Sequence, residues 1–195
     1  MGYSPSNELP YKYDIEKAKK YLREAGFPNG KGLPEFSYDV RGASTTSRQM
    51  GEYIQKELKL IGIKVKLNLN TFPAFLNKAR TGQLEIWQGG WAMDYPDPEN
   101  VIQLLTTKNH SPGPNSTFYS NKSVDELYNK LFFINDKEQA LEITNKVQNK
   151  VAEEIPWVMQ FYSRNYILHQ GYVKNFRQSD SVSYTHLTLP TKRIV

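Results

Sequence analysis

The sequence contains no cysteine, which excludes disulfide bonds, thiolate metal sites and cysteine nucleophiles. Histidine is scarce, and its three positions, 110, 169 and 186, show neither metal-ligand spacing nor a G-x-S-x-G nucleophile segment nearby. Apolar runs extend over only a few residues, too few for a membrane-spanning helix. These absences leave no sequence support for thiol chemistry, a bound metal, another cofactor or a serine–histidine triad.

The opening segment, MGYSPSNELPYKYD, has no basic region, apolar region or small-residue cleavage site, so no signal peptide is predicted. This observation fits a cytoplasmic protein. It fits equally a chain whose natural N-terminus lies further upstream, and the segment itself does not choose between the two.

Charged residues are present in nearly balanced numbers. The chain has 25 basic and 20 acidic side chains among 195 residues, with a net charge of +5. The two signs are interleaved, as in DIEKAKKYLREAG, which is typical of a solvated helix face rather than of a nucleic-acid surface. With a hydrophobic fraction of 38%, the composition predicts one soluble globular domain that does not bind nucleic acid.

Hydrophobic periodicity predicts alternating helices and strands. Helical patterns cover residues 15–25, 45–60, 72–79, 100–106, 124–133 and 137–154, with Asp14, Ser44 or Thr45, and Asp136 as N-caps. Strand patterns cover EFSYDV, IKVKLNLN and LEIWQGGW, followed near the end by WVMQFYS and NYILHQ. The β-α-β-α-β order of the first part predicts an α/β sheet with crossover helices.

The stretch GGWAMDYPDPEN at residues 89–100 carries three acidic residues on a proline-rich turn. Asp97 and Glu99 fit the start of a helix, where acidic side chains meet the positive end of the helix dipole. A carboxylate pair for glycoside hydrolysis is the alternative interpretation. Asp94 stands apart because it follows an apolar strand, and ligands of α/β sheets bind beyond the strand carboxyl ends. Trp91 lies three residues before Asp94, and for it ligand contact and core packing both stay open.

This turn, with the order of elements around it, resembles the extracellular solute-binding proteins of family 5, the peptide-binding components of ABC importers. YDIEKAKKYLREAGFPNG is similar to the family segment YDPEKAKKLLAEAG, and VQNKVAEEIPWVMQFY fits a late helix and strand. The resemblance runs from Tyr13 to Asp180. It implies an α/β, periplasmic-binding-protein-like (type II) lobe with a mixed sheet flanked by helices, incomplete in this chain, in a protein whose two lobes close on a ligand.

The resemblance also implies the site residues. Asp94, the aspartate of the family's GW-x-x-D turn, would pair with the α-ammonium of a peptide beside Trp91. Gly89 and Gly90 would let the ligand backbone approach closely. Phe72 falls where an aromatic residue lines the pocket, although a packing role fits it as well. Gln88 stands where some oligopeptide binders carry an arginine, which leaves recognition of the ligand carboxylate open.

Family members are more than twice as long as this chain and begin with an export signal. We therefore expect residues 1–180 to be part of the second, C-terminal lobe of a monomeric, non-enzymatic protein. Its full form is expected to be periplasmic or extracellular, to deliver peptides to permease subunits, and to meet the membrane only through the permease or an N-terminal lipid anchor. Residues 181–195, SVSYTHLTLPTKRIV, resemble translated adapter DNA and are expected to be non-native.

Two other interpretations stay open. The first is a small α/β hydrolase that uses Asp94 with Glu99 or Asp97. The second is a fragment that has no function as written.

Overall fold

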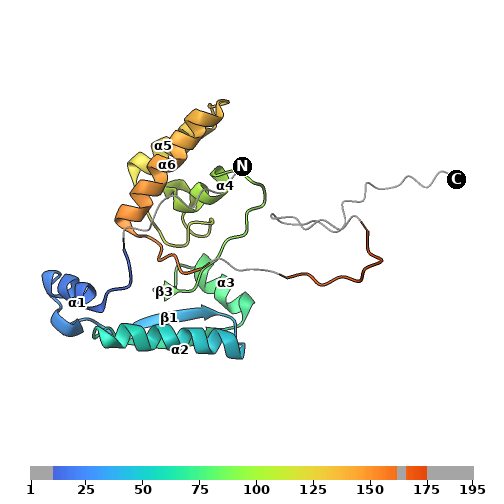
Figure 1. The fold of residues 1–195 in the computed structure, drawn as a ribbon. Helices are drawn as coiled ribbons and strands as arrows, with labels where there is room; N and C mark the ends of the chain where they lie inside the picture. The colour runs from blue at the N-terminus through green and yellow to red at the C-terminus, as the bar shows by residue number, and fades with distance from the viewer. Residues whose placement is uncertain (1–10, 162–165, 175–195) are drawn as a thin grey trace.

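The structure is a computed structural model that describes residues 11–161 and 166–174 (Figure 1). The described chain forms a small sheet with its helices and, further along the sequence, a group of helices. The strand that ends at Trp87 leads through an irregular segment into the helix that begins at Glu99, and this segment connects the two groups (Figure 1). The α/β fold expected from the sequence is confirmed.

The sheet consists of three parallel strands in the order β2-β1-β3: β1 (Phe36–Arg41), β2 (Val65–Asn70) and β3 (Ile86–Trp87). Phe36 pairs with Val65 at the start of β1 and Arg41 pairs with Asn70 at its end. Helix α2 (Thr45–Leu60) connects β1 to β2, and helix α3 (Phe72–Arg80) connects β2 to β3. Helix α1 (Ile15–Glu24) precedes the sheet.

The alternation of side chains along β1 gives the sheet an apolar face and a polar face. Tyr38 and Val40 are buried in the sheet core together with Val65 and with side chains from α2. On the other face, Asp39 bonds to Lys78 of α3. The two crossover helices therefore cover different faces of the sheet, and α3 covers the polar one.

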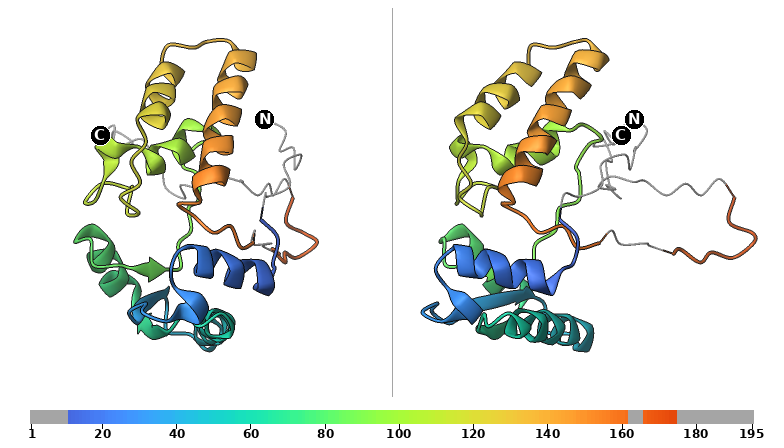
Figure 2. Two further views of the ribbon diagram at one scale, coloured as in Figure 1. Left: turned by 90° about the vertical axis from the view of Figure 1, so that its left-hand side faces the viewer. Right: turned by 60° about the vertical axis from the view of Figure 1, so that its left-hand side comes forward.

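The second group of elements is helical. It contains α4 (Glu99–Ile102), which continues as the 3-10 turn Gln103–Leu105, a further 3-10 turn (Thr107–Asn109), α5 (Lys122–Leu131) and α6 (Lys137–Glu154). Figure 2 shows α5 and α6 side by side as a helical hairpin. The hydrophobic core of this second group contains five buried side chains: Ile102, Leu105, Val124, Tyr128 and Val147.

Local capping chemistry explains why most helix bounds agree with the sequence. The side chains of Asp14, Ser44 and Asp136 each accept a hydrogen bond from a backbone N–H of the first helical turn, as predicted. Helix α5 begins two residues earlier than predicted, because the Asn121 side chain caps it at Ser123 and Val124.

Three predictions about strands were wrong. Strand β3 contains only Ile86 and Trp87, because the pairing with β1 ends just before the two glycines. The described sheet is parallel throughout rather than mixed, as expected when helices make both crossovers. WVMQFYS and NYILHQ form no strand where the structure describes them, at residues 157–161 and 166–170; residues 162–165 lie outside the described part. A strand needs a partner, and Val158 and Leu168 are instead 79% and 97% exposed.

Among the described residues, the structure contains no helix with the length and hydropathy needed to cross a membrane. The expected tail at residues 181–195 lies outside the described part of the chain.

Candidate functional site

The carboxyl ends of the three parallel strands bring side chains from separate segments together. Arg41 is the last residue of β1, and Phe72 follows β2 as the first residue of α3. The Arg41 guanidinium carbon lies 4.6 Å from the centroid of the Phe72 ring. A Cβ atom on Gly90, which follows β3, would lie 3.9 Å from a guanidinium nitrogen of Arg41. We call Arg41, Phe72 and Gly90 the strand-end cluster.

Two more of the predicted residues, Gln88 and Gly89, lead from β3 into this cluster. The Gln88 backbone N–H donates to the carbonyl oxygen of Asp39 at 3.0 Å, which extends the β1–β3 contact by one residue. A Cβ atom on Gly89 would lie 3.7 Å from the indole nitrogen of Trp87, an ordinary van der Waals distance. The backbone of Gln88 is therefore fixed by the sheet, and the chain leaves the sheet at Gly89.

The acidic turn folds back onto the first residues of α4. The Trp91 indole N–H donates to the side-chain oxygen of Asn100 at 2.8 Å, and the Asp94 backbone N–H donates to the same oxygen at 3.2 Å. Asn100 is 1% exposed, whereas Trp91 is 48% exposed. One buried amide thus connects both predicted ligand contacts of the turn.

The Asp94 side chain is exposed, and no described residue donates a hydrogen bond to its carboxylate or forms an ion pair with it. A carboxylate that is held on a structured turn and has no internal partner is available to a cation from outside. Asp94 adjoins the strand-end cluster along the chain, because Gly90 of that cluster directly precedes Trp91.

The other two acidic residues of the turn are engaged within the protein. Asp97 accepts a hydrogen bond from the Glu99 backbone N–H at 2.9 Å, which is a helix-start contact. The Glu99 carboxylate accepts from the hydroxyl of Tyr128 at 2.5 Å and from the hydroxyl of Tyr95. Burial and the bond to Glu99 raise the pKa of the Tyr128 hydroxyl, and the bond to Glu99 raises the pKa of Tyr95. These contacts fit the helix-start interpretation of Asp97 and Glu99.

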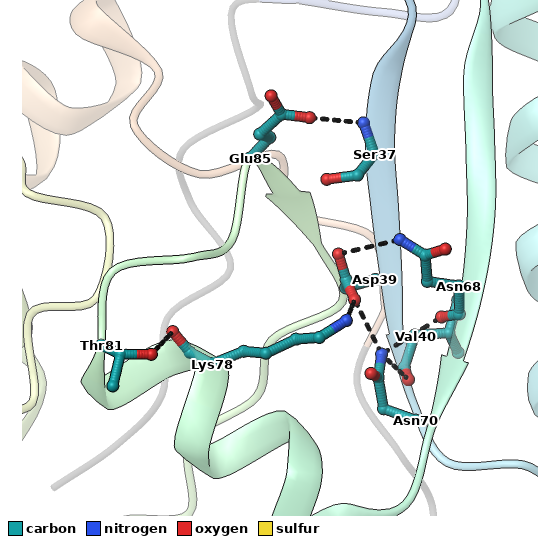
Figure 3. Close-up of polar contacts among 8 residues, drawn as sticks. All are labelled: Ser37, Asp39, Val40, Asn68, Asn70, Lys78, Thr81 and Glu85. Atoms are coloured by element: carbon teal, nitrogen blue, oxygen red, sulfur yellow. Dashed lines mark hydrogen bonds and ion pairs between the residues drawn. The ribbon is translucent and has the colours of Figure 1, made fainter.

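A buried polar cluster that sequence reasoning missed lies beside the strand ends (Figure 3). Asp39 of β1 is 1% exposed, and its carboxylate lies 2.6 Å from the Lys78 ammonium of α3. It also accepts from the side-chain amides of Asn70 at 2.9 Å and Asn68 at 3.4 Å. Burial raises the pKa of Asp39, but the bonds from Lys78, Asn70 and Asn68 outweigh burial and hold this pKa below its ordinary value.

This cluster attaches α3 to the polar face of the sheet, and α3 carries Phe72 at its first position. Its sequence signal was the aspartate inside EFSYDV together with the two asparagines spaced by two in VKLNLN. Arg41 was missed as well, although it directly follows EFSYDV, where a parallel strand presents its carboxyl end.

A cavity of about 400 Å³ lies on the α2 side of the sheet. Its lining is mainly apolar, and none of the predicted site residues belongs to it. The lining residues are Tyr38, Gln49, Met50, Tyr53, Ile54, Gln160 and Phe161.

The sequence of this chain is similar to those of several solute-binding proteins. Heme-binding protein A of Haemophilus influenzae is 28% identical over 191 residues, covering 91% of this chain and 35% of the relative. Di/tripeptide-binding protein 2 of Pseudomonas aeruginosa is 24% identical over 180 residues, covering 92% of this chain and 34% of the relative. The chain therefore spans about a third of the length of these curated relatives.

Solved structures agree in fold. The ABC transporter-associated periplasmic binding protein DppA of Helicobacter pylori, in complex with the peptide STSA, matches with a TM-score of 0.70 and 29% identity. The match covers 80% of this chain and 30% of DppA. HbpA2 of Haemophilus parasuis matches with a TM-score of 0.70 and 28% identity, over 80% of this chain and 31% of its own. These matches confirm the α/β fold of type II periplasmic binding proteins.

The family model for bacterial extracellular solute-binding proteins, family 5 Middle, matches residues 1–113. Since this match covers more than half of the 195 residues, the chain belongs to the bacterial extracellular solute-binding proteins of family 5.

Proposed function

We propose that the chain supplies part of the peptide-binding surface of a substrate-binding component of an ABC importer. The observation that carries the proposal is the state of the Asp94 carboxylate, which is exposed and has no partner among the described residues. The turn that presents this carboxylate is bonded to Asn100. Two relatives support a peptide ligand: one is named a di/tripeptide-binding protein, and the other was solved with a bound peptide.

Asp94 would pair with the α-ammonium of the peptide. A charge-assisted hydrogen bond of this kind contributes about 1.5–3 kcal/mol net, and N-acetylation of the ligand removes it. The half-exposed Trp91 would lie beside the first residue of the ligand. Gly89 and Gly90 carry no side chain that would keep the peptide backbone away.

Arg41 would meet the opposite charge of the ligand. Its guanidinium stacks on Phe72, and no described carboxylate pairs with it. A guanidinium has five N–H donors arranged for planar recognition of a carboxylate. Gln88, whose backbone N–H bonds to the Asp39 carbonyl oxygen, is neutral and would offer its side-chain amide as a further donor. An anionic site on the turn and a cationic site at the strand ends together match the two charged ends of a peptide.

Ligands differ within the family, because one relative is named a heme-binding protein and another a di/tripeptide-binding protein. A free peptide is the proposed ligand here because it carries an ammonium, which Asp94 would bind, and a carboxylate, which Arg41 would bind.

The wider assignments are part of the same proposal. Residues 1–180 form part of a second lobe, and residues 181–195 are not native to it. The complete protein works as a monomer in the periplasm or outside the cell and passes its ligand to permease subunits. It is not an enzyme; turnover of a glycoside or peptide that is lost in Asp94→Asn would instead favour the hydrolase.

The test is an NMR titration of the 195-residue chain with trialanine and with N-acetyl-trialanine, extended to millimolar concentration to detect weak binding. Free trialanine is expected to shift the amide resonances of residues 88–95, whereas the acetylated peptide and the Asp94→Asn variant are expected to give little shift. Glu153→Gln, which removes the same charge from an exposed position of α6, serves as the control. Equal shifts with both peptides would contradict the proposal.

A further inference from the structure

The acidic turn is attached to the helical core rather than to the sheet. Its attachment points are the first two residues of α4. Glu99 accepts from the Tyr95 hydroxyl on the turn and from the Tyr128 hydroxyl, which belongs to a side chain only 4% exposed in the helical core. Asn100 accepts from the Trp91 indole and from the Asp94 backbone.

Asn100 differs from Glu99 in burial and in what it holds. Its side chain is 1% exposed, and one oxygen atom accepts both bonds, at 2.8 Å from the Trp91 indole nitrogen and at 3.2 Å from the Asp94 backbone nitrogen. A buried acceptor that is shared by two donors fixes the distance between them. The Asp94 backbone nitrogen is bonded to the Cα atom from which the Asp94 side chain extends, so this bond fixes where the side chain begins.

We propose that Asn100 is the positioning residue of the peptide-binding turn: its amide oxygen fixes the Trp91 indole and the Asp94 backbone, and with them the place on the turn from which the Asp94 side chain extends. This inference rests on the proposed function. Asn100 itself is buried and does not touch the ligand. It acts by keeping the turn ordered before the ligand arrives, which removes an ordering cost from binding.

The experiment measures solvent exchange of two protons by NMR, the Trp91 indole N–H and the Asp94 amide N–H, in the 195-residue chain without ligand. In Asn100→Leu, which is similar in size and has no acceptor, both protons are expected to exchange about five- to tenfold faster. Unchanged exchange in Asn100→Leu would overturn the proposal.

Asn115→Leu is the matched control. Asn115 is also buried, at 0% exposure, but its side chain donates to the carbonyl oxygens of Thr106 and Tyr119, away from the turn. This variant is expected to lose stability without faster exchange at Trp91 or Asp94. Faster exchange at these two protons in Asn115→Leu would show that loss of any buried amide loosens the turn, and would overturn the specific role of Asn100.

Trp91→Phe is a second variant for the exchange measurement, and it changes no buried residue. The phenyl ring lacks the indole donor, but Asn100 still accepts from Asp94, so the Asp94 N–H is expected to remain protected. Loss of that protection would show that Trp91, rather than Asn100, holds the turn.

Peptide titration then separates the two proposals. Asn100→Leu is expected to weaken binding of free trialanine about tenfold and to leave binding of N-acetyl-trialanine unchanged. If Asp94→Asn has no effect on either peptide, the proposed function fails, while the exchange measurements, which use no ligand, still decide the role of Asn100.

Discussion

Asp39 shows how much of the strand-end geometry depends on a single buried charge. Its carboxylate lies within the sheet at 1% exposure, and Lys78 provides the compensating charge at 2.6 Å. Such a pair is weak evidence for net stability, but removal of one partner leaves the other charge buried and uncompensated. The main consequence of the pair is that α3 must lie where Lys78 can reach the Asp39 carboxylate.

Lys78→Met is expected to lower the free energy of unfolding by about 3 kcal/mol at neutral pH, because Asp39 then lies buried without a cation. The measurement is urea unfolding followed by circular dichroism. Lys146→Met removes an equally short ion pair, to Glu142, from an exposed face of α6, and is expected to leave stability nearly unchanged. Equal losses in the two variants would contradict the specific role of the buried pair.

The same variant is expected to show a dependence on pH. The folded pKa of Asp39 lies below its ordinary value, so its contribution to stability is present above the unfolded pKa of about 3.9 and is lost as the pH falls through the folded pKa. The unfolded pKa of Asp39 is the same in both proteins, and without Lys78 the burial of Asp39 raises its folded pKa in the variant. The difference in stability between wild type and Lys78→Met is therefore expected to shrink as the pH falls from this raised folded pKa towards the lowered folded pKa of wild type. A difference that stays constant from pH 7 to pH 3 would show that Asp39 is not its source.

Single residues also show what the sequence could reveal of the site. Asp94 and Trp91 lie in one unusual local stretch, and their accessibility agrees with a role in binding. Asn100 looked like an ordinary helix-start residue, because its burial depends on packing of the helical core. Arg41 and Lys78 gain their roles from contacts with Phe72 and Asp39, 31 and 39 positions away, which no local pattern contains.

At the scale of elements, α2 lies close to the sheet because Gly51 has no side chain. A Cβ atom there would lie 2.6 Å from a methyl of Leu67 and 3.0 Å from a methyl of Val40. Val40 is fully buried and stiff, so it yields little, whereas the end of Leu67 is more adaptable. Helix propensity and packing therefore oppose each other at this position.

Gly51→Ala is expected to destabilise the protein by about 1 kcal/mol. The gain in helix propensity is about 1 kcal/mol, and overpacking of a filled core costs about 1–3 kcal/mol. Thermal or urea unfolding measures the difference. Gly90→Ala is the comparison, because among the described residues its new Cβ atom would come within 4 Å of Arg41 alone, at 3.9 Å. It is expected to leave stability unchanged while weakening peptide binding. A stabilised Gly51→Ala would show that Leu67 moves aside at little cost.

The elements that the sequence predicted well are those whose ends are specified locally. Helices α1, α2 and α6 begin after side-chain caps that are visible in the sequence. Strands β1 and β2 follow each other in the sequence, with only α2 between them, and pair with each other in the sheet. WVMQFYS has the composition of a strand, but strand formation depends on a neighbouring backbone that the described chain does not provide at residues 157–161.

At the scale of the whole molecule, the candidate site is an open surface. Phe72 and Trp91 are 46% and 48% exposed, and the Asp94 carboxylate faces solvent. Small-ligand sites of high affinity enclose most of the ligand surface, and an open surface covers only one side of it. The contacts on this chain therefore provide direction and charge rather than enclosure.

The 195-residue chain is accordingly expected to bind free peptides only weakly, with a dissociation constant on the order of 1 mM. Isothermal titration calorimetry with trialanine and a longer peptide measures the affinity. A micromolar dissociation constant would show that this surface encloses its ligand without any further part of the protein.

The two charged groups of the site belong to different cores. Arg41 ends a strand of the sheet core, whereas the turn that carries Asp94 is bonded to Asn100 and Glu99 of the helical core. In the described residues, these two hydrophobic clusters share no side chain. The distance between the Asp94 carboxylate and the Arg41 guanidinium therefore depends on how the helical group packs against the sheet, for example through the Ser111 hydroxyl, which donates to the Ala79 carbonyl oxygen of α3 at 2.7 Å. A substitution at this contact, far from Asp94 and Arg41, would be expected to change the length of peptide that fits between the two charges.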